Sequence, residues 1–304
     1  SPDTWFAMFN SDNNRRSTQT TYRLFGKLTQ KFGSEESNSE ESASTIKNAF
    51  FTIQGDYTNN KWTYGDPNHR DNLFHYGYVG KFDTYKAPIY QDGIAVDSIN
   101  GIPYTGAILS GWADTLYTFL PGGINPGLVN YTSAYYQMFS EYGMNSYQAP
   151  TMGNFGVDAS NDGVIRTAAD LQGQGLMNGG SPASVYSLFA NHGSVYNGYS
   201  KYDNSQVTFK ASGSADIKSH EFSFGFEFEQ RKDNYWGTSP MGLWGLMRQQ
   251  ANKHILERDL SNPNPVTDAN GIYQDTINYD RLFIGAEQSD FDRNLRGVLG
   301  LNPN

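Results

Sequence analysis

The segment that most constrains the fold is Glu221–Glu229, in which every second residue is phenylalanine and the residues between are acidic or small. Side chains of a β-strand alternate between its two faces, so this segment is expected to be a strand with one apolar and one polar face. Residues 206–212 alternate in the same way, and the short polar stretch 216–220 lies between the two segments. The pattern predicts a β-hairpin with a tight turn.

A second pair of segments lies upstream. Residues 22–29 and 49–57 alternate less cleanly, and both are predicted to be strands, the second continuing through Trp62 and Tyr64. The acidic, Ser-rich run 33–42 between them is typical of a solvated turn or flexible loop. Residues 74–85 are a further candidate strand, because small residues are interleaved with rings there.

Between about Ile89 and Tyr202 the chain is rich in Gly, Pro, Asn, Ser and Tyr, and we expect no strand there. Short helices are predicted at residues 131–139 and 181–189, the second from a Ser-Pro pair that suits a helix start. A further amphipathic helix is predicted at residues 241–256 from apolar residues at helical spacing.

The two connections between predicted strands differ greatly in length: a few residues around Lys218, and a very long stretch after Tyr85. Outer-membrane barrels have short turns on the inner side and long loops outside. The predicted fold class is therefore all-β, with antiparallel transmembrane β-barrel strands forming a partial barrel and long extracellular loops that contain short helices. The predicted parts are early barrel strands with an acidic loop (1–85), a long extracellular loop region (86–202), a barrel hairpin (203–236) and a second loop region (237–304).

Composition narrows the function classes. The net charge of −9 argues against a nucleic-acid partner, since phosphate binding needs clustered Lys and Arg. No stretch approaches the roughly 20 apolar residues of a membrane-spanning helix. The absence of cysteine removes disulfide scaffolds, thiolate metal sites and Cys nucleophiles. Residues 1–5 have no signal-peptide pattern, so the protein is expected either not to be secreted or to be a mature or internal piece.

Catalytic chemistry is not predicted. The sequence has no nucleophile elbow, phosphate loop, zinc-protease motif or dinucleotide fingerprint. Its five histidines, at positions 69, 75, 192, 220 and 254, lack ligand spacing. Glu227 and Glu229 fall on the same face of one strand, whereas a glycosidase needs acids on opposite sides of a sugar. We expect no enzyme activity and no cofactor, with one possible exception for structural Ca²⁺.

That exception is the segment from Asp158 to Val164. Asp158, Ser160 and Asp162 supply oxygens at the first, third and fifth places of a calcium loop, Val164 would contribute at the seventh, and Gly163 takes the sixth. The closing position holds Ala169 in place of Glu, so an EF-hand is excluded. A turn rich in Asn and Asp is the favoured alternative.

The aromatic residues allow two interpretations. Rings near the predicted strand ends are placed where an interfacial girdle would lie; these are Trp62, Tyr64, Tyr76, Tyr78, Tyr235 and Trp236. Rings deeper in the predicted loop region form either a ligand-stacking surface or a small core, and we favour the core; these are Trp112, Tyr117, Tyr135, Tyr136 and Tyr142.

Two blocks of the chain resemble the barrel region of Bacteroidota TonB-dependent receptors of the Oar-like type, which carry a carboxypeptidase-regulatory-like domain. The first is Tyr22–Tyr90, with residues 46–50 and 70–82 most alike, and the second is 203–249, with the closing 291–301. Residues 90 to 200 support the resemblance least. Members of that family are several times longer and have a signal peptide, TonB box and plug, so this chain is expected to be an internal slice of a barrel.

The resemblance implies an outer-membrane receptor that imports a ligand too large for porins, with the TonB system acting through parts of the chain that are not present here. Its partners would be the lipid bilayer and a surface lipoprotein or other outer-membrane complex subunits. Trp112, Tyr135, Tyr136 and Trp244 are candidates for the ligand or partner surface. Two alternatives remain open: a structural or assembly subunit built on a receptor-like barrel, and a secreted β-rich adhesin.

In such a barrel wall each strand has a lipid side and a lumen side. The residues predicted to face lipid are Leu24, Leu28, Phe51, Ile53, Val207, Phe209, Phe222, Phe224, Phe226 and Phe228. The residues predicted to face the lumen are Gln54, Asp56, Lys210, Glu221, Glu227 and Glu229.

Overall fold

The computed structural model describes residues 10–32, 46–141, 164–171, 176–180 and 193–302. These residues fall into two compact units. One unit, here called the long sheet, consists of Arg16–Gly65 and Gly198–Thr238. The other, here called the inserted unit, consists of residues 1–15, Asp66–Asn197 and Ser239–Asn304. Within the described ranges, the long sheet is built from β-strands alone, whereas the inserted unit contains both β-strands and helices.

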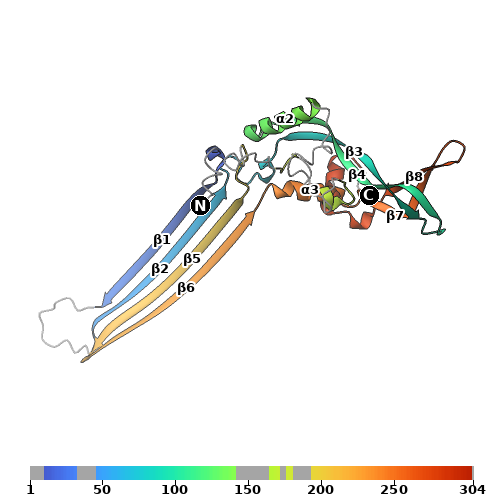
Figure 1. The fold of residues 1–304 in the computed structure, drawn as a ribbon. Helices are drawn as coiled ribbons and strands as arrows, with labels where there is room; N and C mark the ends of the chain where they lie inside the picture. Colours follow the sequence, from blue (N-terminus) through green and yellow to red (C-terminus); the bar gives the residue numbers. More distant parts are fainter. Residues whose placement is uncertain (1–9, 33–45, 142–163, 172–175, 181–192, 303–304) are drawn as a thin grey trace, which may run out of the picture. The chain divides into compact units, whose positions relative to one another are not determined.

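The long sheet contains four antiparallel strands in the order β1-β2-β5-β6, and Figure 1 shows them side by side. The strands are β1 (Arg16–Phe32), β2 (Ile46–Gly65), β5 (Tyr199–Ile217) and β6 (His220–Thr238), each 17 to 20 residues long. Continuous pairing joins β5 to β6 through a two-residue turn, in which Lys218 has a φ of 54°. A positive φ is what such tight hairpin turns require.

These strands confirm the strand predictions for residues 22–29, 49–57 and the 206–229 hairpin, including the extension of β2 through Trp62 and Tyr64. The chain leaves the sheet after Gly65 and returns at Gly198, so the whole of Asp66–Asn197 lies between β2 and β5. The chain leaves and re-enters the sheet at the same end, which is the end opposite the two-residue turn between β5 and β6.

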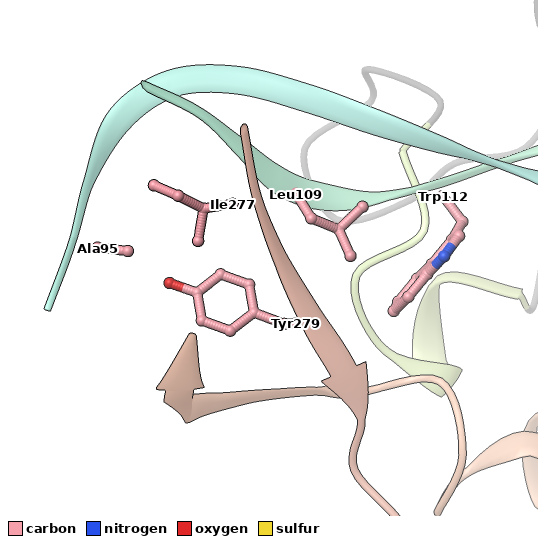
Figure 2. Packing of buried hydrophobic residues seen from close by; sticks show 5 residues of the cluster. All are labelled: Ala95, Leu109, Trp112, Ile277 and Tyr279. Atoms are coloured by element: carbon pink, nitrogen blue, oxygen red, sulfur yellow. The ribbon is translucent and has the colours of Figure 1, made fainter. Parts of the chain in front are cut away.

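The inserted unit has its own four-stranded sheet, in the order β3-β4-β8-β7. It comprises β3 (Gly80–Val96), β4 (Pro103–Pro121), β7 (Arg258–Thr267) and β8 (Tyr273–Arg281). All pairs are antiparallel except a short parallel contact between β4 and β8. Figure 2 shows the core that this contact creates, where Ala95, Leu109, Trp112, Ile277 and Tyr279 pack together.

The prediction that residues 89–202 contain no strand is wrong, because β3 and β4 form a long hairpin there. The register of this hairpin shifts at Asp83/Thr84 and again at Ile89/Tyr90. Each irregularity exchanges the faces of all following side chains, so a strict alternation does not persist. Pro88 further weakens the sequence signal, and it is tolerated because β3 is an edge strand.

The predicted division of the chain also differs from the two units. Residues 66–85, assigned to early barrel strands, belong to the inserted unit, and the candidate strand 74–85 becomes a short 3-10 helix η2 (Leu73–His75) followed by the start of β3. Residues 86–202 and 237–304, predicted as loop regions, contain most of β3 and all of β4, β7 and β8.

Among the described residues, the other helices lie in the inserted unit: α2 (Pro126–Glu141), η4 (Ala168–Leu171), α3 (Gly242–Asn252) and α4 (Asp290–Val298), besides the 3-10 turns η1 (Ser11–Asn13) and η6 (Gly285–Glu287). Helices α2 and α3 confirm two of the predicted helices, while residues 181–189 lie outside the described residues. Along the part of the chain that the structure describes, no helix has the length and apolar character needed to cross a membrane.

Candidate functional site

The strand register sorts the side chains of the long sheet onto two faces, because residues paired directly across antiparallel strands point to the same side. On one face, Leu28 pairs with Ile53, Ile53 with Ala211, and Ala211 with Phe226. The next row away from the β5–β6 turn contains Phe209 and Phe228. Every residue predicted to face lipid lies on this side, here called the apolar face. Contact of this face with lipid stays a prediction.

The apolar face is exposed over its whole width. Phe224 is 73 % exposed, Leu24 69 %, and Phe226 60 %. Contiguous apolar surface of this size is uncommon on a soluble monomer and marks a surface that another molecule or a membrane covers. In the described residues no second layer of secondary structure packs on this sheet. The apolar face is therefore the strongest candidate for a functional surface in the chain.

Its apolar part occupies only one half of the sheet. On β1 it runs from Leu24 to Phe32, nine residues that span about 27 Å along the strand. Tilted strands of about 9–11 residues cross the apolar band of outer-membrane barrels, so nine residues match the lower end of that range. The rest of each strand on the same face is mainly polar, with Asn59, Ser205 and Lys232 in its first row.

The opposite side, here called the polar face, contains every residue predicted to face the lumen. Lys210 Nζ lies 2.7 Å from Glu227 Oε1 across β5 and β6. The Gln54 amide donates hydrogen bonds to both Asp56 carboxylate oxygens, at 3.1 and 3.0 Å. These side chains satisfy one another or water, which is the environment that charged groups need. Phe25 is an exception, since it lies on this face and is 79 % exposed.

Four rings cluster on the polar face at the end of the sheet opposite the β5–β6 turn. Tyr202 lies between Trp62 and Tyr235 in one cross-strand row, with ring centroids 6.3 and 4.5 Å away, and Tyr64 is 5.9 Å from it in the next row. The predicted girdle is thus corrected for Trp62, Tyr64 and Tyr235, because they point away from the apolar face.

The other girdle residues fall in different places. Trp236 lies on the apolar face, in register with Lys201. Tyr76 and Tyr78 are in the inserted unit, and Tyr76 is fully buried. Strand alternation alone predicts this placement, because Trp62 and Tyr64 are an even number of residues from Asp56, and Tyr235 is an even number from Glu227.

The residues suggested for a ligand or partner surface serve mainly as packing residues. Trp112 is 5 % exposed in the core of Figure 2. Tyr136 packs against Phe82 and Phe119 with centroids 5.8 and 5.6 Å away, and its hydroxyl donates to the Leu176 carbonyl. This agrees with the favoured core interpretation of both residues.

Tyr135 and Trp244 complete that set. Tyr135 is half-buried beside Tyr136, and burial raises the pKa of its hydroxyl. The Trp244 ring lies 5.3 Å from Phe74 and 5.8 Å from Tyr78, and its indole nitrogen donates to the Tyr76 carbonyl.

The calcium loop cannot be placed as a whole, since Asp158, Ser160 and Asp162 lie outside the described residues. Val164 is described and is 3 % exposed, beside the Ile165 bridge to Trp112. Among the described residues, no group of three or more His, Cys, Asp or Glu side chains is arranged to hold a metal ion.

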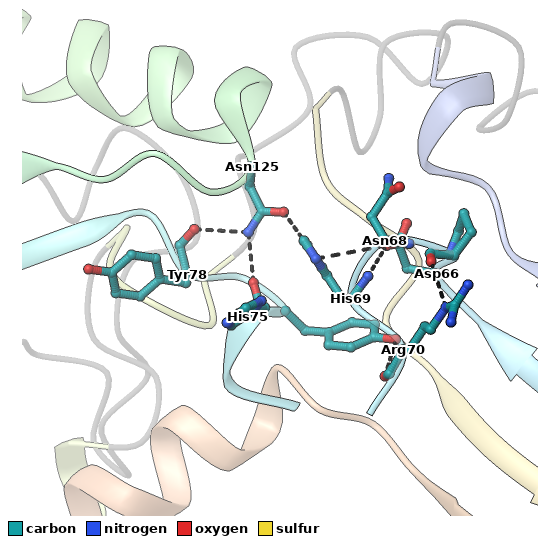
Figure 3. Close-up of polar contacts among 9 residues, drawn as sticks. Asp66, Asn68, His69, Arg70, His75, Tyr78 and Asn125 are labelled. Carbon is teal, nitrogen blue, oxygen red and sulfur yellow. Dashed lines mark hydrogen bonds and ion pairs between the residues drawn. The ribbon is translucent and has the colours of Figure 1, made fainter. Parts of the chain in front are cut away.

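Figure 3 shows a buried polar network that follows β2. Asp66 Oδ1 accepts hydrogen bonds from the backbone amides of Asn68 and His69. His69 Nε2 lies 2.6 Å from Asn125 Oδ1, and the Asn125 amide donates to the carbonyls of His75 and Tyr78. The network ties three segments together at the start of α2, so its role is structural.

A second buried cluster joins α4 to the end of α3. Asp292 accepts from Gln288 at 2.9 Å and from Arg296 at 3.0 Å, and its carboxylate lies 3.1 Å from His254 Nε2. Burial lowers the pKa of His254, and the Arg296 charge adds to this effect while Asp292 opposes it. No serine or threonine hydroxyl bonds to His254 among the described residues, so the cluster does not form a nucleophilic triad.

Comparison of the chain with protein-family models and with curated proteins finds no match.

Proposed function

We propose that the long sheet is part of the wall of an outer-membrane β-barrel, with its apolar face against lipid and its polar face towards an aqueous lumen. The observation that supports this most strongly is the exposed, contiguous apolar face backed by a face of Lys, Glu, Gln and Thr. Barrels that cross membranes show this alternation, because lipid-facing and lumen-facing residues follow one another along each strand.

The strand lengths support the same proposal. Strands of 17 to 20 residues are far longer than the usual five or six of soluble proteins. The apolar half would cross the membrane, and the polar half would extend the wall beyond it. The strand connections also support the proposal, because outer-membrane barrels have short turns at one end and long loops at the other. Here a two-residue turn joins β5 and β6 at one end of the sheet, whereas Asp66–Asn197 separates β2 from β5 at the other.

The outer edges of β1 and β6 are unpaired in the described residues. In a bilayer, unpaired edges leave backbone groups without hydrogen bonds, at a cost of several kcal/mol for each group. The proposal therefore requires further strands beside β1 and β6, which close the wall. Energy-dependent import of a ligand too large for porins, through a TonB system, is the function proposed for this barrel, and it rests on the resemblance of residues 22–90 and 203–249 to TonB-dependent receptors.

The test is extraction of the full chain from its native cells. The proposal predicts that it stays in the outer-membrane fraction through salt and carbonate washes and requires detergent for release. Release into the aqueous phase without detergent would support a secreted adhesin, in which a second protein layer covers the apolar face. Membrane retention without energy-dependent uptake would support an assembly subunit built on the same barrel.

A further inference from the structure

The apolar face changes character abruptly where its apolar half ends. An open hollow of about 600 Å³ lies at this boundary. Tyr22, Leu24 and Tyr57 line it on the apolar side. Lys61 and Lys232 line it on the polar side. The hollow therefore offers apolar and cationic groups side by side on one face of the sheet.

Positive charge is concentrated beyond this boundary. Arg16, Lys61, Lys201 and Lys232 share the apolar face with a single carboxylate, Asp203. That excess is unusual in a chain whose net charge is −9.

Asp203 neutralises only part of this charge. It lies 3.7 Å from Lys61 Nζ and accepts a 2.7 Å hydrogen bond from the Asn59 amide. In the described residues Lys232 forms no ion pair, and its side chain is exposed. Arg23 also lines the hollow, so its lining contains three cationic residues, of which Lys61 is paired with Asp203.

We propose that this hollow, here called the cationic hollow, binds the anionic phosphate headgroup of a membrane lipid whose acyl chains lie along the Phe-rich half of the same face. The inference rests on the proposed membrane position of the apolar face and adds to it a defined lipid partner. Lys61 and Lys232 contact the phosphate, and the amides of Asn59 and Asn234 line the remainder of the hollow.

The depth of the two lysines fits a headgroup layer. Lys61 is four residues beyond Tyr57 on β2, and Lys232 is four residues beyond Phe228 on β6, which is about 13 Å along each strand. With the usual strand tilt of about 35–45°, this becomes about 10 Å along the membrane normal. The headgroup region occupies about 5 to 7 Å on each side of the hydrocarbon, so the backbones of these lysines lie just outside it. Lysine side chains near that boundary extend their ammonium groups to the interface.

A membrane lipid fits better than a free phosphate ion. The hollow is continuous with the exposed apolar face, so a ligand with attached acyl chains gains contacts that a soluble anion cannot make. The ligand should therefore be amphiphilic and anionic, and its binding should weaken as salt screens the lysines.

The experiment uses the full chain purified in a non-ionic detergent and titrated with phosphatidylglycerol or phosphatidylcholine, with bound lipid counted by native mass spectrometry. The wild-type chain should retain phosphatidylglycerol in preference to phosphatidylcholine. Lys61→Gln together with Lys232→Gln should weaken phosphatidylglycerol retention roughly 30-fold, about fivefold for each lysine. The matched control is Lys27→Gln together with Lys31→Gln, which removes the same charge from the polar face and should retain the preference.

Equal retention of the two lipids by the wild-type chain, or an equal loss in the control variant, would overturn the inference. This failure differs from failure of the proposed function. A protein that needs detergent but shows no headgroup preference is a membrane protein without this site, whereas a protein that stays soluble and monodisperse without detergent contradicts both.

Discussion

Lys210 and Glu227 face each other across β5 and β6 with 2.7 Å between Nζ and Oε1, while their neighbours Phe209 and Phe226 point to the other side of the sheet. One step along either strand thus exchanges a charged environment for an apolar one.

Replacing Phe224 with Lys should be costly. Phe224 is 73 % exposed on the apolar face, and a lysine at the middle of a lipid-facing surface lowers the free energy of unfolding by about 2 to 4 kcal/mol. Urea unfolding of the full chain in lipid vesicles measures the change. The control is Ser223→Lys, one residue earlier on the polar face, which should alter stability by less than about 1 kcal/mol. Equal effects of the two substitutions would place both faces in water.

The Lys210–Glu227 ion pair should contribute little to the stability of the protein. Both side chains are about half exposed, at 47 % and 55 %, and exposed ion pairs typically stabilise proteins by 0.2 to about 1 kcal/mol. Glu227→Gln should therefore change the free energy of unfolding by less than about 1 kcal/mol. A double-mutant cycle with Lys210→Met isolates the pair, and a coupling energy above about 2 kcal/mol would show that the polar face is dehydrated.

Tyr202 should contribute more to the free energy of unfolding than a residue on an uncovered sheet usually does. It makes three ring contacts, with Trp62, Tyr64 and Tyr235, and an aromatic pair contributes about 0.5–1.5 kcal/mol beyond its buried area. Tyr202→Ala should thus lower the unfolding free energy by roughly 2 to 4 kcal/mol. Tyr202→Phe keeps all three contacts and is the matched control. If both variants lose the same stability, the hydroxyl is responsible and the ring cluster is not.

Acid should loosen the inserted unit through His254. Burial holds the pKa of this residue below its ordinary 6.5, so the unfolded chain binds the proton more tightly than the folded chain. The contribution to stability is complete above about pH 6.5 and is lost as pH falls below that value towards the folded-state pKa. Thermal unfolding between pH 8 and pH 5 measures it.

The control for this pH effect uses two variants. His254→Gln should flatten the acid limb of the stability profile, whereas His220→Gln, at the exposed β5–β6 turn, should leave it unchanged. An identical acid limb in wild type and His254→Gln would assign the pH dependence to other groups.

Sequence alone predicted the strands of the long sheet and the face of each side chain because period two persists there. The alternation from Phe222 to Phe228 shows which side chains of β6 lie on the apolar face. Residues paired directly with them on β5, β2 and β1 lie on the same face. The strands of the inserted unit could not be predicted from alternation. Its β3–β4 hairpin shifts register twice, and its β7 strand contains Pro263 and Pro265, which are compatible with a strand only because β7 is a sheet edge.

The candidate surface could also be predicted only in part from the sequence. The apolar and polar faces follow from alternation, but the cationic hollow does not, because Lys61 and Lys232 are far apart in sequence. Their proximity depends on the pairing of β2 with β5 and of β5 with β6, which brings Asn59, Ser205 and Lys232 into one cross-strand row. No local pattern specifies that β2 pairs with a strand beyond the inserted unit.

The central claim is that the apolar face meets lipid and the polar face meets water. The chain has no cysteine, so single cysteines introduced at each position from 222 to 229 can be spin-labelled without background. In lipid vesicles, labels at Phe222, Phe224, Phe226 and Phe228 should be accessible to oxygen and shielded from an aqueous nickel complex. Labels at positions 223, 225, 227 and 229 should show the reverse. Equal access of the nickel complex to both sets would contradict the account.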